Sequence, residues 1–314
     1  MTRWYRKYDG SCNWLEKDHT DEGKYGTAKS RDYDQHYYAD NISSPREGPN
    51  PRAVSNAFFK RKESIFYEHT PLLLGLVEFI MHDISWSQDA KDCNTNPTEC
   101  ISVPMPDDEE IFDKNTTLRV YRTEAVPGTG TSPQNPRENL NRASTWLDVS
   151  SLYGSTPDTG RALRSFKGGK LLTQDVLTKG TSKKGSYLPY NSMIKGDRVS
   201  TRTRPGVDVK NLFAGGDPRT NEDWIMLSVH TLFLREHNRL CDLLAAKKPE
   251  LNDEELFQTT RLLLGAKFSL IGNAYQMAYF KDMDWPADDG IDTQTRRCGF
   301  ATANMNQVSH YTAR

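Results

Sequence analysis

Residues 230–240 read HTLFLREHNRL and lie inside a longer segment, 221–246, in which apolar residues recur at helical spacing. The apolar stripe of this segment is formed by Trp224, Leu227, Val229, Leu232, Phe233 and Leu240. A second long helix is expected from Asn252 to about Tyr279, because Asn252 and Glu255 form a capping-box pattern. Little of the chain alternates with the period of two typical of strands. The sequence therefore predicts a mainly α protein.

The rest of the chain is expected to contain one further helix and long loops. Apolar residues again recur at helical spacing over 64–85, and residues 144–153 suit a short helical or turn unit. Residues 1–60, 86–141 and 155–215 are expected to be mostly irregular, because they are rich in turn-forming or charged residues. Such long loops must be held in place by something other than secondary structure.

Charge and hydropathy exclude several function classes. The chain has 314 residues, with Lys+Arg 41 and Asp+Glu 42, so its net charge of -1 gives no reason to expect nucleic acid or an anionic membrane. The longest apolar run, 71–81, contains Glu78 and is much shorter than the roughly 20 residues of a membrane span. No apolar leader follows Met1, so we expect no signal peptide within the chain.

The cysteines and glycosylation acceptors indicate an oxidising compartment. Five cysteines are too few for a disulfide scaffold, and an odd number leaves at least one unpaired. Cys93 and Cys100 bound a turn-rich segment that a disulfide could close into a small loop. The acceptors at Asn41 and Asn115 point the same way. Cys241 lies in the helical pattern and is expected to be a buried thiol.

Two separate stretches carry groups suited to splitting an O–O bond. Residues 78–83, EFIMHD, place the imidazole of His82 beside a carboxylate at the end of an apolar run. Residues 215–222, GGDPRTNE, place Arg219 three residues before another carboxylate. A base can take the proton of a peroxide while a cation stabilises the developing negative charge. Alone, His82 would more often be a core histidine and Arg219 an ordinary loop arginine, so the hypothesis depends on the blocks that accompany them.

These blocks together resemble the animal haem peroxidase superfamily, which includes myeloperoxidase, peroxidasin and, more remotely, the cyclooxygenases and fatty-acid dioxygenases. The blocks are residues 8–13, 49–56, 78–83, 136–139, 146–155, 215–222 and 230–240. The resemblance covers roughly residues 5–280. It implies a mainly α peroxidase fold and an oxidoreductase with haem b, which reduces hydrogen peroxide and oxidises small organic or halide donors.

On the matching positions, the resemblance implies that His82 is the distal histidine and Arg219 the distal arginine. Glu78 stands where the peroxidases usually have glutamine, and its negative charge puts halide binding in question. Glu222 matches one of the two carboxylates that form ester bonds to haem, whereas Met81 replaces the other. We therefore expect at most one ester, through Glu222, or a non-covalent haem. A thioether or sulfonium bond from Met81 is chemically feasible.

The resemblance also implies a Ca²⁺ site. Its expected ligands are Asp83, Ser144, Trp146, Asp148 and Ser150. Alternating residues of a tight turn can direct side-chain and carbonyl oxygens at one centre, and two carboxylates suit this hard cation. The ion would join the loop to the segment that carries the distal histidine. The plainer alternative is a helix N-cap with incidental Asp and Ser.

In the family, a proximal histidine that binds the iron follows the distal arginine along the chain. Counted from Arg219, its expected position falls near the end of this sequence. His310 is nearby, but its surroundings are unlike those of the family. We therefore expect residues 1–314 to form a single peroxidase-like domain, incomplete at both ends, from a longer secreted enzyme. The alternatives are a fatty-acid dioxygenase, a degenerate member that does not bind haem, and a non-catalytic interaction domain. The electron donor and the oligomeric state stay open.

Overall fold

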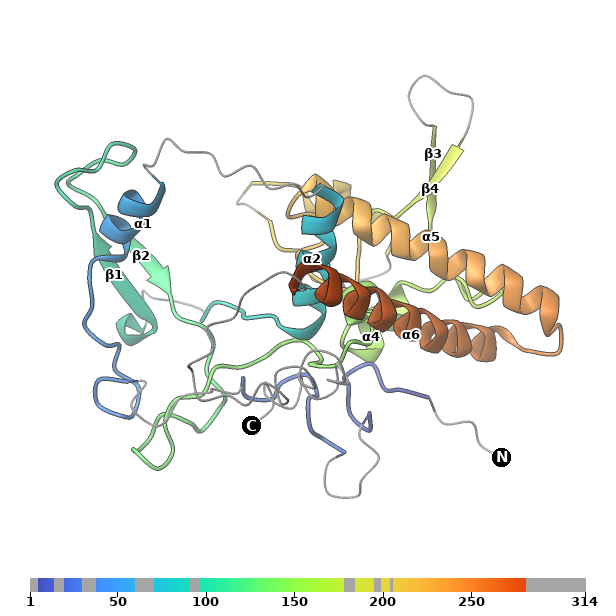
Figure 1. Cartoon of the computed structure of the whole chain (residues 1–314), viewed down its shortest axis with the longest axis horizontal. Coiled ribbons are helices and arrows are strands. Elements are labelled where there is room, and N and C mark those ends of the chain that lie inside the picture. The colour runs from blue at the N-terminus through green and yellow to red at the C-terminus, as the bar shows by residue number, and fades with distance from the viewer. Residues whose placement is uncertain are drawn as a thin grey trace. The chain divides into compact units, whose positions relative to one another are not determined.

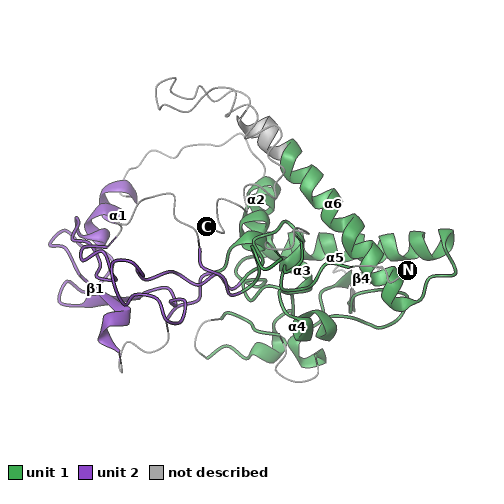
Figure 2. Cartoon of the chain, turned by 90° about the horizontal axis from the view of Figure 1, so that it is seen from below, with its two compact units in different colours: residues 1–25, 70–86, 143–313 green, residues 26–69, 87–142, 314 purple. Residues whose placement is uncertain are grey.

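The chain forms two compact units, which Figure 2 colours green and purple. The first contains residues 1–25, 70–86 and 143–313, and the second contains residues 26–69, 87–142 and 314. This computed structural model describes residues 5–13, 20–29, 38–59, 71–90, 96–177, 184–194, 199–203 and 206–280. Every residue expected at the catalytic and calcium sites lies in the first unit.

Helices dominate the first unit, in agreement with the predicted mainly α fold. Its main helices are α2 (Pro71–Ile84), α5 (Trp224–Lys247) and α6 (Asp253–Phe280), and α5 contacts both of the others (Figure 1). Each helix contributes one buried aromatic ring to a shared cluster. The ring of Phe79 lies 5.0 Å from that of Phe233 and 5.5 Å from that of Phe268. These contacts fix α2, and with it His82, against the long helices.

The long helices begin at side chains that satisfy their first backbone N–H groups. Asp223 caps α5, because its carboxylate accepts hydrogen bonds from Ile225 N at 2.7 Å and Met226 N at 2.8 Å. At α6, Glu255 N donates to the Asn252 side chain at 3.0 Å, and Asn252 N donates to the Glu255 carboxylate at 3.1 Å. The capping box predicted from the sequence is confirmed.

The start of α2 and its approach to α5 depend on two special residues. Within the described part of the expected 64–85 helix, α2 begins at Pro71, whose ring pre-sets the backbone angle of a first helical turn. Gly75 is buried, and a Cβ atom there would lie 2.3 Å from Cγ2 of Ile225. A larger residue at position 75 would therefore push α2 away from α5.

Short elements follow the site loop in the first unit. They are α3 (Ser150–Tyr153), α4 (Pro157–Ala162), the antiparallel pair β3 (Gln174–Leu177) and β4 (Lys184–Tyr187), and the 3₁₀ turns η3 (Asn191–Met193) and η4 (Val209–Asn211). The sequence predicted the turn unit at 144–153 but expected 155–215 to be mostly irregular. That expectation missed α4 and the β3–β4 pair, because segments of four to six residues carry little periodicity.

The second unit is built on a small sheet. It contains α1 (Pro51–Phe59), the 3₁₀ turn η2 (Pro97–Glu99) and strands β1 (Cys100–Pro104) and β2 (Thr117–Tyr121), which pair antiparallel (Figure 1). Both strands are largely exposed, so the sequence showed no apolar alternation there. Cys93 lies outside the described residues, and the expected Cys93–Cys100 loop stays a prediction. Among the described helices, none is long and apolar enough to cross a membrane.

Candidate functional site

His82 lies near the C-terminal end of α2 and is 8% exposed. Its Nε2 is 3.7 Å from a carboxylate oxygen of Glu222. Its Nδ1 is buried without a hydrogen-bond partner among the described residues. Burial and, to a smaller extent, the nearby positive charge of Arg219 lower the pKa of His82 to about 4. The imidazole is therefore neutral at pH 7 and able to accept a proton.

Arg219 is fixed from two sides. Its Nε and Nη2 donate to the Asp217 carboxylate at 2.9 and 2.7 Å, and its backbone N donates to the same carboxylate at 2.7 Å. Nη2 also donates to the carbonyl oxygens of His82 at 3.1 Å and Ser85 at 3.0 Å. These carbonyls carry the negative end of the α2 dipole, which favours a cation. None of these bonds uses Nη1.

Three carboxylates surround this pair. Glu78 precedes His82 by four residues on α2, so the two side chains lie on one helix face. Burial raises the pKa of Glu78, and the negative charges of Asp223 and Glu222 raise it further, against the opposing effect of Arg219. The Glu222 side chain is 46% exposed, and its backbone N donates to the Arg219 carbonyl at 2.8 Å.

The structure thus brings together His82, Arg219, Glu78 and Glu222 from two segments far apart in the sequence. The fifth residue expected near the cofactor, Met81, is 55% exposed on α2. Its thioether is accessible, in contrast to the buried imidazole that follows it.

Asp83 connects α2 to the loop that was expected to bind Ca²⁺. The residue is fully buried, and its carboxylate accepts hydrogen bonds from Val149 N at 3.0 Å and Ser151 N at 2.9 Å. The hydroxyl of Ser150 lies 3.2 Å from the same carboxylate and donates to the Asp83 carbonyl at 3.0 Å. The loop is therefore tied to the residue next to His82.

Asp148 is the second buried carboxylate of this loop. It accepts hydrogen bonds from the Ser144 hydroxyl at 2.9 Å and from Ser150 N at 3.0 Å. The carbonyl of Trp146 accepts from Asp148 N at 2.8 Å, which closes a tight turn. All of the expected calcium ligands therefore lie on one continuous network of hydrogen bonds with Asp83.

The two carboxylates repel one another. Burial raises the pKa of Asp83 well above its usual range, and the charge of Asp148 raises it further. Burial also raises the pKa of Asp148, although the positive charges of Arg261 and Arg6 act in the opposite direction. No group of three or more His, Cys, Asp or Glu side chains suited to a metal occurs among the described residues. A cation here would depend on hydroxyl and carbonyl oxygens as well as the two carboxylates.

The backbone of the loop is strained at Val149. This β-branched residue has φ 61° and ψ 33°, in the left-handed region that such side chains rarely adopt. Its backbone N–H is one of the two that bind the Asp83 carboxylate. Strain is thus placed where the loop contacts Asp83.

Two aspartates that were not predicted from the sequence hold the site together. Asp217 clamps Arg219, and Asp223 both caps α5 and raises the pKa of Glu78. Asp223 could have been recognised as an N-cap, since it directly precedes the apolar periodic segment. Asp217 gave no such signal, because only the folded loop brings its carboxylate to the guanidinium two residues later.

The two histidines of α5 are fully buried. His237 Nε2 donates to the Gly169 carbonyl at 2.9 Å, so its Nδ1 accepts the hydroxyl proton of Tyr153 at 2.7 Å. His230 has no hydrogen-bond partner for either ring nitrogen among the described residues, and burial lowers its pKa to about 3. Cys241 is buried as expected, and burial raises its pKa to about 11.

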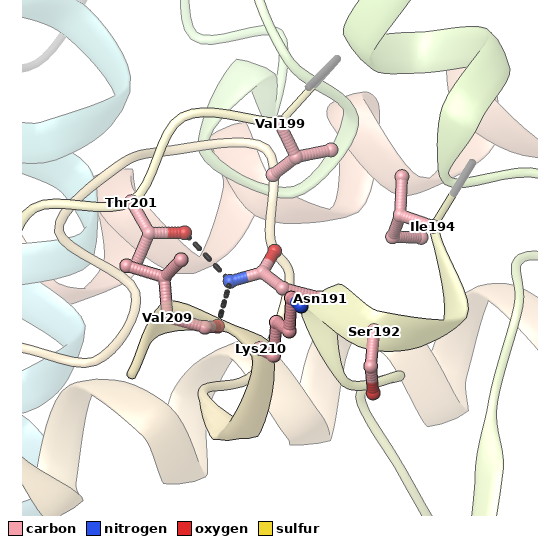
Figure 3. A pocket seen from close by; sticks show the side chains of 7 residues that line it. All are labelled: Asn191, Ser192, Ile194, Val199, Thr201, Val209 and Lys210. Atoms are coloured by element: carbon pink, nitrogen blue, oxygen red, sulfur yellow. Dashed lines mark hydrogen bonds between the residues drawn. The ribbon is translucent and has the colours of Figure 1, made fainter. Parts of the chain in front are cut away.

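A pocket of about 520 Å³ is lined by residues of the segment 191–210, which precedes the Arg219 loop in the sequence (Figure 3). Its lining residues are Asn191, Ser192, Ile194, Val199, Thr201, Val209 and Lys210. Asn191 Nδ2 donates to the Thr201 hydroxyl at 2.8 Å and to the Val209 carbonyl at 3.0 Å (Figure 3). Arg202 N donates to the Pro218 carbonyl at 2.8 Å, which joins this wall to the residue before Arg219. The pocket is lined by none of the residues expected at the site.

Comparison with known proteins places this arrangement in a family. The profile of animal haem peroxidase matches residues 5–275, and the chain belongs to that family. Human dual oxidase 2 is 31% identical over 265 residues, which are 82% of this chain and 16% of that protein. Human thyroid peroxidase is 28% identical over 307 residues, which are 85% of this chain and 32% of that protein. The chain thus spans less than half the length of these relatives.

Solved structures support the fold. Peroxidase A from Dictyostelium discoideum matches with a TM-score of 0.76 and 24% identity over 93% of this chain and 56% of that chain. The fatty acid alpha-dioxygenase of Arabidopsis thaliana matches with a TM-score of 0.62 and 20% identity over 88% of this chain and 37% of that chain. The mainly α peroxidase fold predicted from the sequence is confirmed.

Proposed function

We propose that the chain is the distal part of a haem-dependent peroxidase that reduces hydrogen peroxide and oxidises small electron donors. The observation that carries this proposal is the pairing of His82 with Arg219: a buried neutral imidazole lies beside a guanidinium fixed by Asp217. In the overall reaction, one peroxide and two donor molecules that each give up a hydrogen atom yield two waters and two donor radicals.

The roles of the residues follow from their charge and position. Haem, when bound, supplies the iron that takes up the electrons of the donor. His82 accepts a proton from peroxide and returns it to the departing oxygen, work for which its neutral state is suited. Arg219 stabilises the negative charge that develops as the O–O bond breaks, because its guanidinium is held in place and always ionised. Glu78 borders the pair and adjusts the charge around it.

The residues present fit a haem on the distal side. The unpartnered Nδ1 of His82, the fixed Arg219 and the accessible carboxylate of Glu222 give a base, a cation and an attachment point. We propose one ester link at most, through Glu222, because Met81 supplies no carboxylate. His310 lies outside the described residues, so the proximal ligand stays unassigned.

We also propose that Asp83, Ser144, Trp146, Asp148 and Ser150 bind Ca²⁺. Two carboxylates whose pKa values are raised by burial favour a compensating cation, and the neighbouring hydroxyl and carbonyl oxygens are ligands that Ca²⁺ prefers. The ion would stabilise the contact between this loop and the end of α2.

The same proposal treats residues 1–314 as part of one peroxidase domain of a secreted protein. The family match over residues 5–275 supports a single domain. Asn115, one of the glycosylation acceptors, is exposed just before β2 and therefore accessible to modification. We propose an oxidising, extracellular location on these grounds.

The test is to express the protein with haem, together with any sequence that follows Arg314 in its gene. The proposal predicts a haem absorption band and peroxide-dependent oxidation of guaiacol. Oxygen uptake with a fatty acid, in the absence of peroxide-dependent guaiacol oxidation, would instead indicate a dioxygenase. A protein that binds haem and does neither would contradict the enzymatic proposal.

A further inference from the structure

We propose that this site selects its electron donor by charge: it accepts cationic and neutral donors and excludes anions, halides included. The inference rests on the proposed peroxidase function and names the substrate class of the same site. It makes Glu78 and Asp217 specificity-determining residues.

The first step is that the positive charge of Arg219 is already compensated. The Asp217 carboxylate lies 2.7 and 2.9 Å from two guanidinium nitrogens, and the two side chains are only 5% and 11% exposed. A buried ion pair at this distance presents a dipole rather than a net charge to its surroundings. Arg219 can therefore polarise a neutral peroxide without offering a free cation to an anionic donor.

The second step is that three further acidic side chains lie around His82. A carboxylate oxygen of Glu222 lies 3.7 Å from Nε2 of His82. Glu78 lies one turn before His82 on the same face of α2, and Asp223 directly follows Glu222 in the chain. An ester at Glu222 would remove one negative charge and leave the other two.

The net field at the site is therefore negative. A halide or carboxylate donor that approaches His82 meets repulsion from Glu78 and Asp223, and it meets Arg219 as a member of an ion pair with Asp217. An ammonium group meets attraction instead, and a neutral phenol meets neither. Because Glu78 and Glu222 are partly exposed, solvent screens these effects, and about tenfold per unit charge is the expected scale.

The experiment compares three donors that share one phenol ring and differ in the charge of the side chain: tyramine (cationic), tyrosol (neutral) and 4-hydroxyphenylpropionate (anionic). For the haem-loaded protein at pH 7, kcat/KM should fall in that order, by about tenfold or more from first to last. Glu78→Gln should reduce the tyramine preference by about tenfold. Glu250→Gln, the same change at an exposed position outside the site, should leave the preference unchanged.

A binding measurement provides a readout independent of turnover. Azide is an anion at pH 7, and its titration against the haem absorption gives a Kd directly. Glu78→Gln and Asp217→Asn should each tighten azide binding, by about tenfold, because the first removes a repelling charge and the second frees the charge of Arg219.

The two proposals fail in distinguishable ways. Oxidation of none of the three phenols would contradict the peroxidase function itself. Oxidation of all three with equal kcat/KM, or azide affinities unchanged in both variants, would retain the peroxidase and overturn the charge selection. A preference for the anionic phenol, or rapid bromide oxidation by the unmodified protein, would also overturn it.

Discussion

Nη2 of Arg219 donates to the backbone carbonyl of His82 at 3.1 Å. The proposed acid–base residue and the proposed electrostatic residue are therefore joined through the end of α2. 

His82 and Arg219 themselves are 137 positions apart in the chain. Because Arg219 also binds Asp217 and the Ser85 carbonyl, a change at this arginine affects both the charge of the site and the position of the helix end.

The first prediction concerns the stability of this contact. Arg219→Ala should lower the free energy of unfolding by about 3–5 kcal/mol, because it leaves the buried Asp217 carboxylate without its partner. The double variant Arg219→Ala/Asp217→Ala should be less destabilised than the single one, since no unpaired charge remains. Denaturant unfolding followed by circular dichroism measures both values. Strictly additive losses would show that the two side chains are not coupled.

The second prediction concerns Ca²⁺. Saturating Ca²⁺ should raise the melting temperature, because the proposed ligands converge only in the folded chain, and a concentration of about 100 times Kd stabilises by about 2.7 kcal/mol. A chelator should reverse the shift, and Asp148→Ala should abolish it. Asp158→Ala, which removes an exposed carboxylate of α4, is the matched control and should retain the shift. A melting curve indifferent to both chelator and Ca²⁺ would count against the site.

The third prediction follows from the buried His230. Burial lowers the pKa of His230 to about 3 in the folded chain, whereas an unfolded histidine has a pKa of about 6.5. Below pH 6.5 the unfolded chain therefore binds the extra proton, and stability is lost as the pH falls. At pH 5 this loss is about 2 kcal/mol relative to pH 8. His230→Leu should lack it, so the variant should gain stability relative to the unmodified protein on acidification.

Urea unfolding of both proteins at pH 8 and pH 5 gives the required difference. His82 and His237 also have pKa values lowered by burial, but they titrate in both proteins and cancel in the comparison. The same pH dependence in the variant and the unmodified protein would contradict the buried, neutral state of His230.

The fourth prediction concerns haem attachment. Glu222 supplies an accessible carboxylate beside His82, whereas Met81 supplies none. Acid–organic extraction of the haem-loaded protein, followed by mass spectrometry, should find one ester link at most. Glu222→Gln should abolish ester attachment, and Met81→Asp should increase the fraction of haem retained. Two ester links in the unmodified protein would show that the proposed correspondence of the 78–83 segment is wrong.

The main helices could be predicted because their signals are local. The capping box at Asn252 and Glu255 and the apolar periodicity of α5 lie within short windows, and the structure reproduces both. α1 (Pro51–Phe59) was missed because residues 1–60 were expected to be mostly irregular. In the folded chain the Asn50 side chain accepts from Arg52 N at 2.8 Å and starts a helix instead.

The site could be predicted only in part. His82, Arg219 and Glu222 belong to recognisable segments, and the fold brings them together. The compensation of Arg219 by Asp217 could not be inferred, because it depends on the loop conformation that turns both side chains toward the end of α2. The left-handed conformation of Val149 was equally hidden, since a β-branched residue is a poor candidate for it.

The central claim, that His82 and Arg219 together activate hydrogen peroxide, is tested most directly by stopped-flow mixing of the haem-loaded protein with H₂O₂. The change of the haem absorption gives the rate constant, normalised to haem content. His82→Ala and Arg219→Ala should each lower it by at least about 10²-fold, the scale for loss of an acid–base or electrostatic group. Arg161→Ala, at an exposed position on α4, should leave it unchanged. If both site variants react at rates near that of the unmodified protein, the claim that His82 and Arg219 activate hydrogen peroxide is wrong.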